Sequence, residues 1–130
     1  MVSLSLAACA TITPPPPPSC PQGQQRLRTA QLFFGRDVDG KPDVGDAAFA
    51  RFVDEEMTPR FPDGLTVLDG GSQWRGPENK LIREAAKIVL IVLPGDGKVA
   101  PRLEAVRNAY KTRFKRNSVL LVTQAACVSF

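Results

Sequence analysis

Glu56 is the side chain whose type and position point most directly to chemistry. Apolar residues recur around it at helical spacing and predict one buried face of a helix, at Phe49, Phe52, Val53 and Met57. At about 100° per residue, Glu56 falls on the same arc. A buried carboxylate needs a cationic partner, because burial alone raises its pKa and destabilises the fold. Glu56 is therefore a candidate general acid or base, or half of a buried ion pair, and we favour the ion pair.

Four cations are candidates to pair with Glu56, namely Arg60, Arg75, Arg83 and Lys87. We expect Glu56 to be largely buried and to pair with Arg60 or with a cation from the sheet. Such a pair would close the helix against the sheet.

A second polar group lies on the two arms of a predicted hairpin and comprises Asp69, Gln73, Trp74, Arg75, Arg83 and Glu84. Cross-strand neighbours approach closely, so these side chains could gather at one end of the sheet. One interpretation is a small polar site, with Trp74 as an apolar wall and arginine as an anion clamp. The other, slightly favoured, is a salt-bridged hairpin in which Trp74 caps the core or contacts a second copy.

The chain of 130 residues contains no histidine. This excludes Ser-His-Asp and Cys-His catalysis and a haem held by histidine. The cysteines, Cys9, Cys20 and Cys127, lack the spacing of a zinc motif, and we expect neither metal nor cofactor. If Cys9 carries lipid, Cys20 and Cys127 remain for one disulfide in an oxidising compartment.

Residues 1–25 precede the first charged side chain, Arg26, and read as a signal remnant and tether. Residues 6–9, Leu-Ala-Ala-Cys, resemble the lipobox of a bacterial lipoprotein, in which the cysteine is lipidated. Five prolines at 14–18 favour a stiff polyproline II spacer. Only eight residues, without Lys or Arg, precede Cys9, so the true start lies upstream or the match arises by chance. We expect a lipid-anchored protein of the bacterial cell envelope; the alternative is a cytoplasmic protein with a frayed tail.

Residues 26–130 form one domain of alternating strand and helix patterns. We expect strands at 29–34, 65–74, 81–93 and 118–123, the last extending as far as Val128. Helices are expected at 46–57 and after the Pro94–Gly97 turn, the second with an apolar stripe at Leu103, Val106, Tyr110 and Phe114. Asp46 is expected to cap the first helix, and Gly70-Gly71 to mark a bulge.

The order βαββαβ predicts an α+β, ferredoxin-like two-layer sandwich with an antiparallel four-stranded sheet. Right-handed crossovers place the first and third strands centrally. Residues 88–93 and 119–122 are apolar on both faces of the sheet, although helices cover only one. Dimeric α/β-barrel proteins bury such a second face against another sheet, so we expect a homodimer through the open face.

Residues 58–70, TPRFPDGLTVLDG, resemble a family of small secreted or lipid-anchored bacterial proteins, the domain of unknown function 3574. Gln73-Trp74-Arg75, Arg83-Glu84 and the C-terminal CVSF carry the same resemblance, which covers about residues 26–130. It implies a location in the envelope and a compact α/β domain, and it implies no activity.

Two functions remain open from the sequence. We favour a non-enzymatic binding or structural accessory module anchored to the membrane; the alternative is a small cofactor-independent enzyme of the dimeric α/β-barrel type. A pocket that combines Glu56, Trp74 and an arginine would favour the enzyme. Basic residues spread around the whole polar arc of the second helix, so nucleic acid is an unlikely partner, and the sequence identifies no small-molecule ligand.

Overall fold

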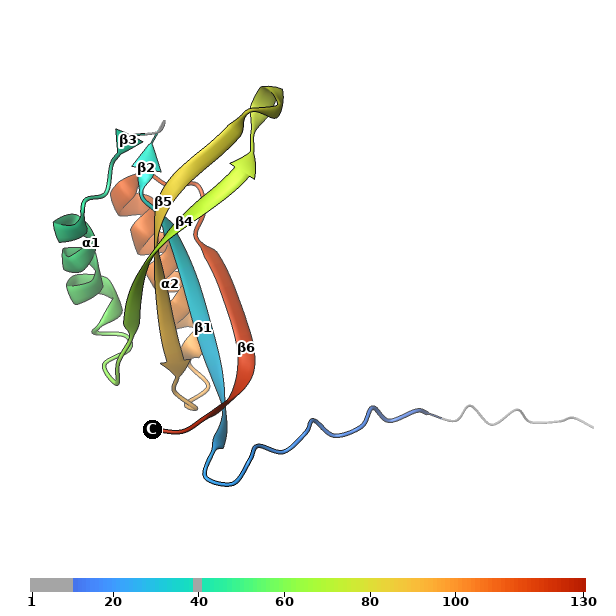
Figure 1. Ribbon diagram of the computed structural model, residues 1–130. Helices are drawn as coiled ribbons and strands as arrows, with labels where there is room; N and C mark the ends of the chain where they lie inside the picture. Colours follow the sequence, from blue (N-terminus) through green and yellow to red (C-terminus); the bar gives the residue numbers. More distant parts are fainter. Residues whose placement is uncertain (1–10, 39–40) are drawn as a thin grey trace, which may run out of the picture.

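The computed structural model of the protein describes residues 11–38 and 41–130 (Figure 1). Its main elements follow the predicted order: β1 (Gln25–Gly35), α1 (Asp46–Phe52) with its π-helical continuation η1 (Val53–Met57), β4 (Thr66–Arg75), β5 (Leu81–Leu93), α2 (Val99–Phe114) and β6 (Leu120–Val128). Shorter elements are the strand pair β2 (Asp37–Val38) and β3 (Lys41–Pro42) and the turn η2 (Pro77–Asn79). The predicted α+β order is therefore confirmed.

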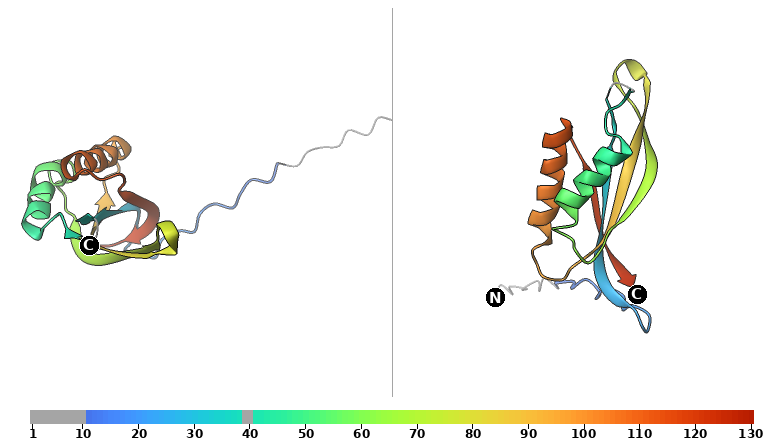
Figure 2. Two further views of the ribbon diagram at one scale, coloured as in Figure 1. Left: turned by 90° about the horizontal axis from the view of Figure 1, so that it is seen from above. Right: turned by 90° about the vertical axis from the view of Figure 1, so that its left-hand side faces the viewer.

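The four long strands form one antiparallel sheet in the order β4-β5-β1-β6. The first and third long strands, β1 and β5, are central, as right-handed crossovers require. Both helices lie on the same face of the curved sheet, which the view from above makes plain (Figure 2). This is the ferredoxin-like sandwich that the sequence predicts.

The core lies between the helices and the sheet, and aromatic rings fill its centre. Phe34 of β1 contacts Phe49 and Phe52 of α1 edge to face, at ring-centroid distances of 5.4 and 5.8 Å. Tyr110 of α2 packs 4.7 Å from Phe34 and 5.1 Å from Phe52. One ring of β1 thus joins both helices to the sheet, and such aromatic pairs stabilise beyond simple burial.

Two local expectations are wrong. Gly45, not Asp46, is the N-cap of α1, and no side chain caps this helix. Strand β4 pairs with β5 without interruption through Gly70 and Gly71, so no bulge interrupts it. Gly70 has a packing role instead, because a Cβ there would lie 2.7 Å from Cδ1 of Ile88.

The segment before β1 is tied to the domain at its end. Residues 14–18 are exposed and form neither helix nor strand, and Cys20 is bonded to Cys127 of β6. Cys9 and the rest of the lipobox-like motif lie outside the described residues. Within the described part of the chain, no helix is long and apolar enough to cross a membrane.

The sheet face opposite the helices carries no covering element among the described residues (Figure 1). Leu68 of β4 and Leu120 and Val122 of β6 are 49%, 58% and 40% exposed on it. Phe33, Ile88 and Leu90 lie half-buried between them. The far arms of β4 and β5 continue past both helices as a projecting hairpin, which η2 closes.

Candidate functional site

Glu56 is the centre of an ion-pair group at the C-terminal end of η1. Arg60 donates to Oε2 of Glu56 at 2.8 Å and to the backbone oxygen of Glu56 at 2.7 Å. Arg113 of α2 approaches Oε1 at 3.3 Å and also pairs with Glu55 at 2.8 Å. The Glu56 side chain is 25% exposed, so it is half-buried rather than largely buried. It pairs with Arg60 as expected, and the group joins the two helices instead of closing a helix against the sheet.

The six polar residues of the hairpin do not converge on one site. Arg83 donates to Gln73 at 3.0 Å, and Arg75 donates to the backbone oxygen of Asn79 at 2.9 Å. Because side chains alternate along a strand, Trp74 lies on the open face of the sheet, whereas Gln73 and Arg83 lie on the helix side, and Trp74 is 45% exposed. The remaining two members, Asp69 and Glu84, belong to two separate charge groups nearer the core. The projecting hairpin is thus a locally bonded arm, not a polar pocket.

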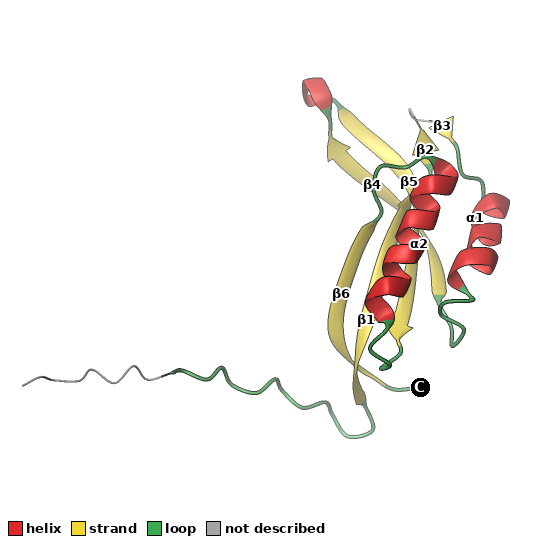
Figure 3. Ribbon diagram, turned by 180° about the vertical axis from the view of Figure 1, so that it is seen from behind, coloured by secondary structure: helices red, strands yellow, loops and turns green. Residues whose placement is uncertain are grey.

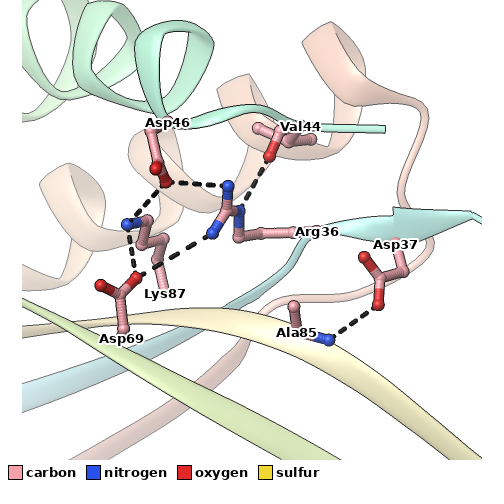
Figure 4. A network of polar contacts seen from close by, with 7 residues as sticks. All are labelled: Arg36, Asp37, Val44, Asp46, Asp69, Ala85 and Lys87. Atoms are coloured by element: carbon pink, nitrogen blue, oxygen red, sulfur yellow. Dashed lines mark hydrogen bonds and ion pairs between the residues drawn. The ribbon is translucent and has the colours of Figure 1, made fainter. Parts of the chain in front are cut away.

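Asp69 belongs to a network of two cations and two carboxylates (Figure 4). The ammonium of Lys87 lies 2.5 Å from Asp69 and 3.0 Å from Asp46, and Arg36 lies 2.9 Å from Asp46. Arg36 also donates to the backbone oxygen of Val44 at 2.8 Å. The network therefore fastens the start of α1 to β1, β4 and β5.

The charges in this network shift each other's titration. The hydrogen bonds that Lys87 donates to Asp69 and Asp46 raise the pKa of Lys87 above its usual range. The hydrogen bond from Lys87 and the charges of Lys87 and Arg36 lower the pKa of Asp46. Lys87 is buried and remains charged at neutral pH, so it is not poised as a nucleophile or base. The network is a structural clamp, although both carboxylates face solvent.

Glu84 pairs with Arg116, which follows α2, at 3.2 Å. Arg116 also donates to the backbone oxygen of Asp37, while its Nε and Nη2 are buried without a hydrogen-bond partner among the described residues. Nearby, Tyr110 donates to the backbone oxygen of Gly35 at 2.7 Å. Burial raises the pKa of Tyr110 to about 12. These contacts tie α2 and the residue that follows it to the end of β1, to β2 and to β5.

Two grooves open at the other end of the molecule, away from the Lys87 and Arg116 groups, and Arg60 of the Glu56 group lines the smaller one. The smaller, about 320 Å³, is lined by the turn that contains Arg60 and Phe61 and by the Asp96–Arg102 ion pair. The larger, about 740 Å³, lies between α2 and the lower parts of β1 and β6. Neither Glu56 nor Trp74 lines either of these two grooves. Among the residues the structure describes, no cluster of carboxylate and cysteine side chains could hold a metal ion.

The sequence patterns do not indicate four residues of these groups, namely Arg36, Asp46, Arg113 and Arg116. Asp46 is expected to cap a helix, and the basic residues of the second helix are expected to form a solvated face. The only signal in the sequence is weak, namely that Arg113 lies one position before Phe114 of the apolar stripe. In the structure, the Arg113 guanidinium lies over the Phe52 ring, 5.5 Å from its centroid. Which of several arginines meets a carboxylate depends on how α2 docks, and periodicity does not contain that information.

The fold and these groups define an α+β sandwich of the split βαβ type with charge clusters at its edges. Residues 29–130 match the family described as "Protein of unknown function (DUF3574)", and the chain belongs to that family. This confirms the resemblance drawn from residues 58–70 and from the C-terminal motif. No curated protein sequence matches the chain.

Solved structures share the fold at low sequence identity. A phage S-adenosylmethionine (SAM) lyase in complex with S-methyl-5'-thioadenosine is 13% identical, with a TM-score of 0.61 over 87% of this chain and 95% of that one. The same kind of enzyme in its apo state is 15% identical, with a TM-score of 0.59 over 81% and 90%. CutA from Synechococcus elongatus PCC7942 is 8% identical, with a TM-score of 0.51 over 78% of each chain. These likenesses show the fold alone.

Proposed function

We propose that this protein is a non-enzymatic binding or structural accessory module of the bacterial cell envelope that forms a homodimer through its open sheet face. The observation that carries the proposal is the composition of that face. Strand alternation places Phe33, Ile88, Leu90, Leu120 and Val122 on it, from three neighbouring strands.

Charged side chains are distributed between the two faces in a way that supports an interface. Among the described residues of β1, β4, β5 and β6, the only charged residue on the open face is Glu84, which pairs with Arg116. The other charged strand residues alternate to the helix side: Arg26, Arg28, Asp69, Arg75, Arg83 and Lys87. A solvent-exposed sheet face usually carries polar and charged side chains, whereas the core of a protein interface is depleted in charged residues.

A second copy is the occupant that this face fits best. Two identical apolar sheet faces can pack against each other about a two-fold axis, so one surface supplies both halves of the interface. Each aliphatic side chain that becomes buried contributes roughly 1.5–3 kcal/mol by transfer from water. Association entropy offsets several kcal/mol of that sum, so the dimer requires several such residues together.

Sedimentation velocity of the full chain carrying Cys9→Ser tests the homodimer. We expect a dimer for this protein and a monomer after Leu120→Lys, which places an ammonium on the apolar open face at an exposed position of β6. The matched control is Thr123→Lys, on the same strand but on the helix side, and it should leave the dimer intact. A parent chain that sediments as a monomer at high micromolar concentration would overturn the proposal.

The location in the envelope rests on the motif around Cys9 and on the exposed proline segment that separates it from the domain. The Cys20–Cys127 disulfide supports an oxidising compartment, because disulfides persist there and are rare in the cytosol. Metabolic labelling with a radioactive fatty acid, in cells that express the gene with its upstream region, tests the anchor. Label that is lost in Cys9→Ser supports it; a soluble, unlabelled protein argues for the cytoplasmic alternative.

A small cofactor-independent enzyme is the second candidate. The observation in its favour is that two structures of a phage SAM lyase share this fold over most of their length. Thermal unfolding with S-adenosylmethionine or S-methyl-5'-thioadenosine tests this candidate, because a ligand of the native state raises the midpoint. An unchanged midpoint with both compounds removes the lyase-like version of the enzyme hypothesis.

A further inference from the structure

The larger groove is an apolar channel on the helix side of the sheet. Because α2 lies over β1, the edge strand β6 is left uncovered on this side, as the view from behind shows (Figure 3). The walls come from the loop after β5, from the first turns of α2 and from β6, and include Leu93, Val99, Leu103, Leu121 and Ala125. Its volume of about 740 Å³ lies in the range of small-molecule sites, which are mostly apolar with a few polar groups.

Two arginines stand on one wall of this groove. Arg26 and Arg28 are two positions apart on β1, so both side chains point to the helix side, about 7 Å from one another. Neither forms an ion pair with a carboxylate in the part of the chain that the structure describes. Arg26 donates to the backbone oxygen of Pro18 at 3.0 Å, and Arg28 donates to the hydroxyl of Thr123 at 3.1 Å.

These arginines differ from the cations at the centre of the charge groups, although Arg75 and Arg83 of the projecting hairpin also have no carboxylate partner among the described residues. Lys87, Arg60 and Arg113 each have a carboxylate within 3.3 Å. Glu104 also lines the groove, but its carboxylate is held by Arg107 at 2.5 Å. A guanidinium has five N–H donors, so both arginines retain donors after the contacts they make. The groove therefore combines an apolar body with two cations that lack an anion.

We propose that this groove binds a single-chain amphiphile with an anionic head group, either a carboxylate or a phosphate. The hydrocarbon chain lies along the apolar wall between α2 and β6, and Arg26 and Arg28 hold the head group. Arginine suits this role because its planar fork matches carboxylate and phosphate oxygens. The inference deepens the proposed binding function by naming a ligand class, and it does not depend on pairing through the opposite sheet face.

Isothermal titration calorimetry tests the proposal on the full chain carrying Cys9→Ser. The probes share one chain length and differ in the head group: decanoate, decyl phosphate and uncharged decanol, each below its micelle concentration, with inorganic phosphate as a head group alone. We expect one or both anionic amphiphiles to bind, decanol to bind at least tenfold more weakly, and inorganic phosphate to give no signal. Whichever of decanoate and decyl phosphate binds more tightly identifies the head group that the site prefers. Decanol that binds as tightly as both overturns the proposal.

Variants of the groove locate the binding. Arg28→Gln should weaken binding of the anionic probe by roughly twofold to fivefold, the range of one exposed charge contact. Ala125→Trp should fill the channel and weaken binding more than tenfold, and Ala100→Trp, from the helix side, repeats this test in case Ala125→Trp does not fold. The matched control is Gln124→Trp, the neighbouring residue on the opposite face, which should bind normally. If both filling variants fold and bind like the parent, the groove is not the site.

The same variants separate this inference from the homodimer. Leu120→Lys should abolish the dimer and leave amphiphile binding unchanged. Ala125→Trp should weaken amphiphile binding and leave the dimer intact. Loss of probe binding in Leu120→Lys would place the ligand at the open face and contradict the inference.

Discussion

Cys20 and Cys127 are joined by a disulfide whose Cα atoms lie 5.5 Å apart. Because Arg26 of β1 pairs with Cys127 of β6, the start of the first strand and the end of the last are neighbours. The bond therefore ties the end of the proline segment to the edge strand. In an anchored protein, it would pass tension from the tether into the sheet rather than into the single strand β1.

Cys127→Ser should lower the free energy of unfolding substantially. The disulfide closes a loop with a sequence separation of 107 residues, and the chain-entropy account gives roughly 4–5 kcal/mol as an upper expectation for such a loop. Urea unfolding of the oxidised parent and of the variant measures the difference. Chemical reduction of the parent should have the same effect, and a loss below about 1 kcal/mol would show that the loop model fails here.

Glu56→Ala should destabilise the domain by about 1 kcal/mol, because the Glu56 side chain is partly wet and its two arginine partners can turn to solvent. Glu56→Gln should cost somewhat less, since an amide can still accept from Arg60. Asp54→Ala, an exposed position on the same helical turn, is the control and should be nearly neutral. A loss of several kcal/mol in Glu56→Ala would instead indicate a deeply buried pair.

Stability should fall as the pH rises from about 10 to about 12. Tyr110 is buried and its folded-state pKa is raised to about 12, so the unfolded chain loses this proton first. The contribution of this pKa shift to the free energy of unfolding is fully present below pH 10. It amounts to about 2–3 kcal/mol and is lost as the pH rises to about 12. Because this is the only tyrosine, tyrosinate absorbance reports on it directly.

Tyr110→Phe provides the control for that titration. It loses the hydrogen bond to the oxygen of Gly35, so it should be less stable at neutral pH by about 1 kcal/mol. Its additional loss between pH 10 and 12 should be smaller than in the parent. Equal alkaline losses in both proteins would exclude Tyr110 as the cause and point to the lysines.

Gly35→Ala should destabilise the sheet by about 1–3 kcal/mol. A methyl group on Gly35 would lie 2.7 Å from the carboxyl carbon of Glu84 and would displace this side chain from Arg116. Gly71→Ala is the matched control, because its nearest neighbour would be a backbone oxygen at 3.8 Å. Thermal unfolding of both variants provides the comparison, and equal midpoints would mean that Glu84 moves aside at no cost.

Local pattern in the sequence was sufficient to predict the elements and their order. The apolar spacing of Phe49, Phe52 and Met57 predicts the first helix, and the continuous apolar run of residues 88–93 predicts a central strand. The pairing of Cys20 with Cys127 also follows from sequence, because once β1 and β6 are antiparallel neighbours, only these ends can meet. Such features depend on backbone periodicity and topology, which a single chain displays.

Apart from the local Glu56–Arg60 pair, which is four residues apart and was expected from the sequence, tertiary structure decided which charges of these groups meet. Asp46 reaches Lys87 and Arg36 because α1 docks with its first turn above β1 and β5, and Glu56 meets Arg113 because α2 lies beside η1. A shift of either helix by one turn, about 5.4 Å, would present a different arginine to each carboxylate without altering any local pattern. The groove beside Arg28 likewise exists because α2 covers β1 and leaves β6 bare. Docking of this kind depends on packing across the whole core, and residue types along the chain do not specify it.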